Sequence, residues 1–437
     1  MPDDISLPPD AITTPPLDSI NPEVAWYKKL GPGLITGAAD DDPSGIATYS
    51  QSGAQFGFNL LWTLFLTYPL MVGIQVISAR IGRVSGHGLA SNIRQFYPAW
   101  LLYGIVSLLL AANTINIAAD ISAMGQATQL VAGGHAQFYA AALGLLSLLL
   151  QVFVPYKRYV NVLKWLTLVL LAYVATAFTV NISWAAVARG ALAPHFSLTK
   201  EYITTVVAIF GTTISPYLFF WQASQEVEEQ LSTPHAKPLV EAPEQAAFHL
   251  KRIKLDTYLG MGFSNLIAFF ILLTTAVALH QHGTTNIDTS AQAAAALKPI
   301  AGQFAFIVFT VGIIGTGMLA VPVLAGSSAY AMAGAFKWEN SLEHLPERAK
   351  AFYSVIAIST VIGTGICFTS IDPIKALYWS AVINGVISVP IMIVMMLMAV
   401  RRDIMGPFVI TWKLKWLGWL ATLMMLAAVV FMLVTLG

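Results

Sequence analysis

Three consecutive carboxylates interrupt the first long apolar stretch of the chain, in the segment Gly37-Ala38-Ala39-Asp40-Asp41-Asp42-Pro43-Ser44-Gly45. A carboxylate within a membrane span is costly, so it is usually present for function. Pro43 lacks a backbone N–H and biases Asp42 away from helical angles, and the flanking glycines let the chain unwind. We therefore expect two half-helices separated by a polar gap near mid-membrane, the arrangement with which many secondary transporters hold a substrate.

The composition places these residues in a lipid bilayer. Of 437 residues, 57% are hydrophobic and only 10% are charged, against roughly 25% charged in soluble domains. The net charge of +1 excludes a strong electrostatic attraction to nucleic acid. The single cysteine, Cys367, cannot form an internal disulfide, and we expect it to be a small buried apolar residue. The chain has no phosphate loop, zinc-protease motif or nucleophile elbow, so we do not expect an enzyme.

Eleven apolar stretches are long enough to cross a bilayer, which requires about 20 residues. The first and the sixth are predicted to be broken, and the eighth to be kinked by its glycines and Pro322. The predicted spans are 31–57, 59–81, 100–125, 137–156, 162–183, 203–225, 255–280, 300–331, 352–371, 376–400 and 415–436.

Basic residues predict the orientation, because cytoplasmic loops accumulate lysine and arginine. With the N-terminus inside, eleven spans place 19 of the 23 basic residues on the cytoplasmic side. The four on the other side are Arg189, Lys200, Lys298 and Lys375. We therefore expect an integral plasma membrane protein, of the bacterial inner membrane, with its N-terminus in the cytoplasm and its C-terminus outside.

The second predicted break is Gly211-Thr212-Thr213-Ile214-Ser215-Pro216-Tyr217 in the sixth span. Because the first span starts inside and the sixth starts outside, the two breaks run in opposite directions. Paired interrupted helices in matching positions of two halves are the best sequence indication of a transport site. We expect a disordered cytoplasmic tail at 1–26 and one all-α transporter domain at 27–437. Within it, 27–200 and 201–400 form an inverted repeat of helices 1–5 and 6–10, and 401–437 adds helix 11.

These residues resemble the Nramp family of proton-coupled divalent-metal transporters. Its first helix carries Gly-Pro-Gly, eight residues, then Asp-Pro-Gly-Asn; here Gly31-Pro32-Gly33 is followed at the same distance by Asp42-Pro43-Ser44-Gly45. Asp120 stands where helix 3 of the family has an aspartate, and Met405-Gly406-Pro407-Phe408 resembles the entry to helix 11. The resemblance implies a leucine-transporter-type fold, with broken helices 1 and 6 and transport by alternating access.

The departures from the family pattern fall on its metal site. Gly45 stands in place of an asparagine ligand, Ser215 in place of a methionine ligand, and Tyr217 in place of a histidine. Because a thioether suits soft metals and oxygen suits hard ions, an all-oxygen site favours magnesium or manganese over soft metals. Asp42 is the predicted metal ligand, and Ser215, Thr212 and Gly45 are the other predicted substrate-binding positions.

Other interpretations remain open for several of these side chains. Asp42 could instead cap the second half-helix, and Ser215 could bond to the broken helix. We expect Asp120, Tyr217 and Asp256 in a proton pathway or gate, with proton symport itself left open. We expect Asp40 or Asp41 to face water. Three carboxylates end the sixth span, Glu226, Glu228 and Glu229, and we expect them to form a solvated face or an ion exit funnel. We expect all histidines to lie at helix ends or in loops.

The predicted function is secondary transport of a cation, most simply a divalent metal, by a monomer that needs no cofactor beyond the transported ion. The alternative is a carrier of the same fold for a small organic solute such as an amino acid. In that case helix N-termini would hold an anionic group, and the small residues Gly45 and Ser215 would leave an enlarged pocket.

Overall fold

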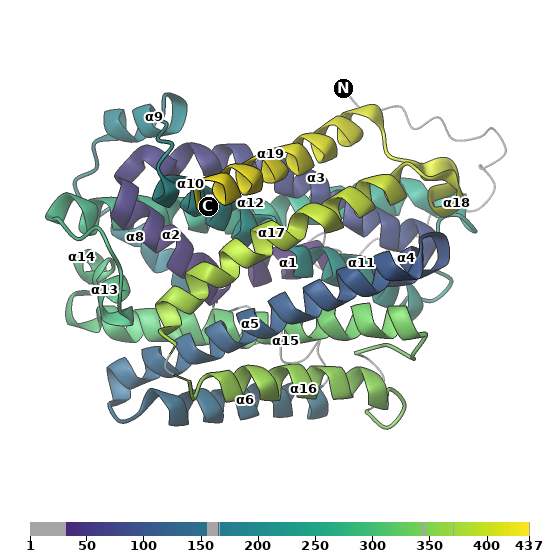
Figure 1. Cartoon of the computed structure of the whole chain (residues 1–437), viewed down its shortest axis with the longest axis horizontal. Helices are drawn as coiled ribbons and strands as arrows, with labels where there is room; N and C mark the ends of the chain where they lie inside the picture. The colour runs from purple at the N-terminus through teal and green to yellow at the C-terminus, as the bar shows by residue number, and fades with distance from the viewer. Residues whose placement is uncertain (1–31, 155–164, 166, 343–345, 370, 437) are drawn as a thin grey trace, which may run out of the picture.

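The structure is a computed structural model that describes residues 32–154, 165, 167–342, 346–369 and 371–436. Every regular element in these ranges is a helix, and short 3-10 turns join several of them (Figure 1). The α-helices are α1 (Pro32–Asp40), α2 (Pro43–Phe56), α3 (Leu61–Ser85), α4 (Leu89–Phe96), α5 (Ala99–Ala132), α6 (Ala136–Phe153), α8 (Leu171–Ala177), α9 (Trp184–Leu192), α10 (Lys200–Thr213), α11 (Pro216–Ser232), α12 (Ala246–Ala278), α13 (Ser290–Ala295), α14 (Lys298–Ala301), α15 (Ala305–Phe336), α16 (Lys350–Ile366), α17 (Pro373–Ala399), α18 (Arg402–Met405) and α19 (Trp412–Leu436).

Eight helical segments of the described chain are long and apolar enough to cross a membrane. One of them, Pro43–Ser85, has 43 residues and would extend about 65 Å as one helix, twice the roughly 30 Å of a bilayer core. Gly57, at a φ of +57°, turns the chain between α2 and α3, so this segment holds parts of two predicted spans. Two shorter apolar helices, Leu168–Ala177 and Lys350–Ile366, lie in the predicted fifth and ninth spans. The count of eleven stays a prediction, and the predicted tail at 1–26 lies outside the described residues.

Both predicted breaks are present, and proline is the local cause of each. Pro43 is the first residue of α2 and Pro216 the first residue of α11, where the missing N–H costs no hydrogen bond. In space, α1 contacts α11 and α2 contacts α10, so the two broken helices lie antiparallel. The helix pairs α3–α12, α5–α15 and α6–α16 also contact each other. This pairing of each half with the other is what the predicted inverted repeat requires.

Helix α12 contacts both halves of the first broken helix. A Cβ atom at Gly37 of α1 would lie 2.2 Å from the backbone of Gly260, and one at Gly53 of α2 would lie 2.1 Å from the Thr275 hydroxyl. Such separations leave no room for any side chain at either glycine, so both half-helices meet α12 at backbone distance. The chain on either side of Asp42 is therefore held by one continuous helix of 33 residues.

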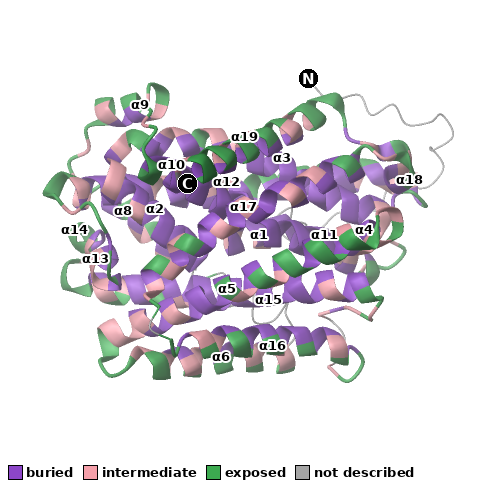
Figure 2. Ribbon diagram, in the orientation of Figure 1, coloured by how far each residue is buried: buried purple, intermediate pink, exposed green. Residues whose placement is uncertain are grey.

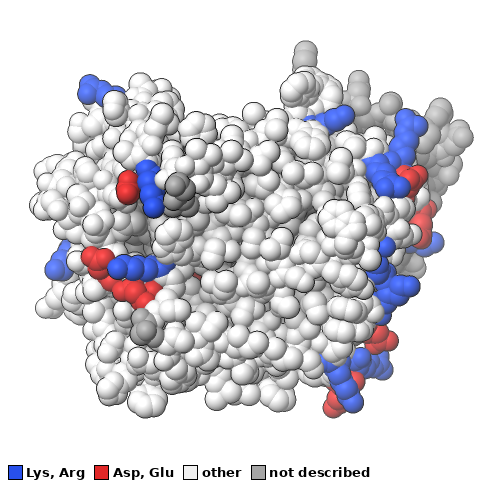
Figure 3. Space-filling view, viewed as in Figure 1, with Lys and Arg blue, Asp and Glu red and all other residues white. Residues whose placement is uncertain are grey.

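The charge distribution separates the two ends of the molecule from its middle. Figure 2 shows buried residues through the central helices and exposed ones along the outer faces of α6 and α16. Figure 3 shows an uncharged band between two charged ends, with lysine and arginine gathered at the end of α4 and α18. The four basic residues predicted for the opposite side lie in α9, α10, α14 and α17, and α9 and α14 lie at the other end (Figure 1).

Candidate functional site

Asp42 lies at the gap between α1 and α2, and its side chain is only 2% exposed. One carboxylate oxygen accepts hydrogen bonds from the backbone N–H of Gly45 at 2.7 Å and from the Ser44 hydroxyl at 2.6 Å. The other accepts from the Asn116 amide of α5 at 3.1 Å and lies 3.5 Å from the Tyr217 hydroxyl of α11. Asp42 thus caps α2, as one interpretation of the sequence held, while its second oxygen faces side chains from two other helices.

Of the residues predicted on the second break, Tyr217 lies beside Asp42, and the hydroxyl groups of Ser215 and Tyr217 already make hydrogen bonds. Ser215 donates to the carbonyl oxygens of Gly211 and Thr212, both at 2.8 Å. Tyr217 donates to the Ala39 carbonyl at 3.1 Å, which ties α11 to the end of α1. These contacts agree with the interpretation that Ser215 bonds to the broken helix; its role as a ligand stays a prediction.

The space at Gly45 is limited. A Cβ atom there would lie 3.2 Å from the Thr212 hydroxyl and 3.4 Å from the Tyr49 ring. The glycine lets α2 come close to α10, and a larger side chain would require the Thr212 hydroxyl to shift. The enlarged pocket expected from the small residues Gly45 and Ser215 stays a prediction.

Asp120 of α5 is fully buried, and neither of its carboxylate oxygens has a hydrogen-bond partner in the described part of the chain. It acts electrostatically on Asp42. Asp120 lies four residues after Asn116, on the same face of α5, so one helix presents both side chains toward the break.

Asp256, also predicted for a gate, lies elsewhere. It is fully buried in α12, eight residues before Ser264 and thus about 12 Å along the helix from it. Its Oδ1 atom is 2.9 Å from a Cβ position at Gly33 of α1. The structure therefore places Asp256 on the contact between α1 and α12 and not beside Asp42.

Asp40 and Asp41 do not face water as expected. They are 1% and 2% exposed, and the Ser264 hydroxyl of α12 lies 2.6 Å from an Asp40 oxygen and 3.0 Å from an Asp41 oxygen. The segment is buried because α12 packs along α1, a tertiary contact that the local sequence does not reveal.

The carboxylates that end α11 are also more enclosed than predicted. Glu226 is fully buried and Glu229 partly buried, and Arg252 of α12 forms an ion pair with each. Glu228 accepts hydrogen bonds from Tyr330 and Ser341. The expected solvated face is therefore wrong for Glu226 and Glu228, because Arg252 and α15 cover them.

His249 lies in the first turn of α12, at a helix end as expected. It is nevertheless 4% exposed, with its ring 2.6 Å from the Arg83 guanidinium of α3. Together with the ion pairs of Arg252, His249 forms a buried polar cluster that connects α3, α11 and α12.

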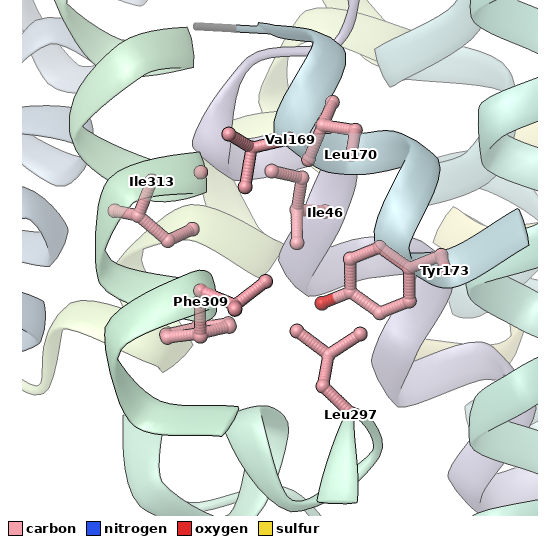
Figure 4. Close-up of a pocket in the computed structure, with 9 residues that line it drawn as sticks. Ile46, Val169, Leu170, Tyr173, Leu297, Phe309 and Ile313 are labelled. Carbon is pink, nitrogen blue, oxygen red and sulfur yellow. The ribbon is translucent and has the colours of Figure 1, made fainter. Parts of the chain in front are cut away.

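Two cavities flank the break. Figure 4 shows Ile46 of α2 pointing into an apolar cavity with Leu170, Leu297 and Phe309, a lining that offers no carboxylate to a cation. On the charged end near α10 and α17, a cleft of about 360 Å³ is lined by Ala47, Gln51, Gln55, Lys200, Glu201, Thr204, Asn286, Ile287, Asp288, Ile374, Lys375, Tyr378 and Trp379. Ala47, Gln51 and Gln55 follow one face of α2 and lead from this cleft toward Asp42.

Solved structures with the same fold include two transporter types. A manganese transporter of Eremococcus coleocola, crystallised with an aromatic bis-isothiourea compound, superposes with a TM-score of 0.70 at 16% identity, covering 97% of this chain and 90% of that one. Mhp1, a nucleobase-cation-symport-1 family transporter in a closed conformation with bromovinylhydantoin, gives a TM-score of 0.56 at 12% identity, covering 92% and 91%. At these identities the likeness shows the fold, which is of the leucine-transporter type.

The family itself is shown by the sequence match. The model of the Nramp family, described as natural resistance-associated macrophage protein-like, matches residues 33–435, nearly the whole chain. The helices that cross the bilayer, the two antiparallel breaks and this match agree with one another. The chain is an integral membrane protein and belongs to the Nramp family of metal-ion transporters.

Proposed function

We propose that the protein is a secondary transporter of a hard divalent cation, and that Asp42 is its principal ligand. The observation that carries the proposal is the charge at the break: Asp40, Asp41, Asp42 and Asp120 are all buried. In the described part of the chain, no basic side chain forms an ion pair with any of them. Buried carboxylates without positive partners are strongly unfavourable in a membrane, and a bound divalent cation would supply the missing charge.

The choice of a hard ion rests on the atoms around Asp42. Its hydrogen-bond partners are a hydroxyl, a backbone N–H, an amide and a phenol, and Ser215 stands where the family pattern has a methionine ligand. Carboxylate, carbonyl and hydroxyl oxygens suit magnesium, calcium and manganese, whereas thioethers suit softer metals. The carbonyl oxygens of residues 41 and 214, which lie between the half-helices, are further candidates, whereas those of Asp42 and Ser215 already accept backbone hydrogen bonds.

Transport would use alternating access between the cleft lined by Gln51 and Gln55 and the opposite end, where Arg252 joins α11 to α12. Proton symport is proposed through Asp120, whose carboxylate is buried without a partner. Tyr217 and Asp256 are proposed as gating residues, because each touches the half-helix α1. Asp120→Asn should then flatten the dependence of uptake on an imposed proton gradient.

Uptake into liposomes tests the proposal. The wild type should accumulate manganese or magnesium, and Asp42→Asn should reduce this uptake to the level of empty liposomes, while Gln55→Glu, at the mouth of the cleft, should leave it measurable. No uptake of manganese, magnesium or calcium by the wild type would overturn the proposal and favour the organic-solute carrier.

A further inference from the structure

Asn116 of α5 touches Asp42, although nothing in the family pattern pointed to it. Its side chain is fully buried. The amide nitrogen donates to the Asp42 carboxylate at 3.1 Å, and the amide oxygen accepts from the Ser380 hydroxyl of α17 at 2.7 Å. One amide therefore joins the break in the first helix to α5 and α17.

The Ser380 hydroxyl can pair with this amide in either of its two orientations. It has a second acceptor, the Leu377 carbonyl, also at 2.7 Å. If the Asn116 amide turns over, its nitrogen can donate to the Ser380 oxygen while Ser380 donates to Leu377. In that arrangement the Asn116 oxygen loses the Ser380 hydroxyl and the Asp42 carboxylate loses its amide donor, and a cation between these two oxygens would replace both partners. The amide oxygen then points toward the Asp42 carboxylate, which is where a bound cation would lie.

Position 45 holds a glycine, which has no side chain to act as a ligand. Asn116 reaches Asp42 from α5. On the basis of the proposed function, we infer that Asn116 is a ligand of the transported cation, through an amide oxygen that turns toward Asp42 when the ion binds. An amide carbonyl is a hard oxygen donor and fits the ligands already assigned.

Two substitutions of equal size separate this role from a purely structural one. Asn116→Leu removes the ligand oxygen and should weaken binding of manganese and magnesium roughly 10-fold. Asn116→Asp keeps an oxygen in place and should bind as tightly as the wild type or more tightly. If Asn116 only donates a hydrogen bond to Asp42, no ligand oxygen is lost in Asn116→Leu, and this variant should bind metal as tightly as the wild type.

The measurement is calorimetric titration of the purified full chain with manganese chloride and with magnesium chloride. Asn113→Leu is the matched control, because Asn113 is a buried amide one turn earlier in α5 that bonds to α15 and not to Asp42; it should bind as the wild type does. Ser380→Ala provides a second variant with Asn116 intact and should weaken binding roughly 2- to 10-fold, because the turned amide loses its acceptor.

The outcomes distinguish this inference from the proposed function. A wild type that binds metal, with Asn116→Leu and Ser380→Ala binding equally well, overturns the ligand role and leaves the transporter proposal intact. Metal binding that is lower in Asn116→Asp than in Asn116→Leu also overturns it. A wild type that binds neither metal overturns both. Should Asn116→Leu elute as aggregate, the comparison of Asn116→Asp and Ser380→Ala with the wild type decides the question.

Discussion

Asp42 caps α2 and is also the proposed cation ligand, and these two roles can be separated by substitution. Asparagine is as good a helix cap as aspartate, so Asp42→Asn should retain the hydrogen bond from Gly45 and unfold within about 0.5 kcal/mol of the wild type. Asp42→Ala loses the cap and should be about 1 kcal/mol less stable than Asp42→Asn. Both variants lose the carboxylate charge. Because an interaction with a charged group contributes about 1.5–3 kcal/mol, both should bind metal about 10- to 150-fold more weakly.

Thermal unfolding in detergent, followed by circular dichroism, measures the first difference, and titration with manganese chloride measures the second. In Asp42→Asn the new amide nitrogen at position 42 faces the Asn116 nitrogen, and both are donors. Asn116 can turn its oxygen toward position 42 and accept this hydrogen bond, because the Ser380 hydroxyl can then donate to the Leu377 carbonyl. Wild-type affinity in Asp42→Asn would show that Asp42 is a cap and no ligand. Equal losses of stability in the two variants would refute the capping argument.

Three further outcomes are expected. Gly45→Ala should lower the unfolding temperature through its contact with the Thr212 hydroxyl, and adding Thr212→Ala should recover part of the loss; additive losses in the double variant would show that the contact does not matter. Gly37→Ala should cost about 1–3 kcal/mol and reduce transport, because its Cβ atom would overlap the α12 backbone; unchanged thermal unfolding would contradict the close contact. Arg252→Met should cost about 3–5 kcal/mol by leaving Glu226 buried and unpaired, and Glu226→Gln in the same chain should restore most of that stability, a rescue that an exposed Glu226 would not give.

The sequence predicted those features that depend on local chemistry. Pro43 and Pro216 act on their own neighbours, so both breaks could be placed to within a few residues, and the length of the apolar stretches gave most of the helices. The family resemblance rested on the same local motif and extended to the fold. Asp42 was identified as the central carboxylate because it interrupts an apolar span directly before Pro43 and stands at the aspartate of the family motif.

What the sequence missed depends on contacts between distant helices. The burial of Asp40 and Asp41 follows from the position of Ser264, more than 200 residues away along the chain. The ion pair of Glu226 joins α11 to α12, two helices that a loop of irregular structure separates along the chain. Asn116 did carry a signal, because a polar residue four positions before Asp120 shares its helix face, but its contact with Asp42 depends on the crossing of α2 and α5.

The glycine contacts of α12 constrain how the first broken helix can move. Gly37 lies about one and a half turns before Asp42 and Gly53 about three turns after it, and both glycines contact a single rigid rod, α12. A hinge at Asp42 therefore cannot open freely: tilting α1 away from α2 must detach α1 from α12 or carry α12 with it. The stiffness of the gap is thus a property of α12 and not of the loop itself. A substitution in α12 far from any cation could therefore change the rate of transport without changing the affinity of the site.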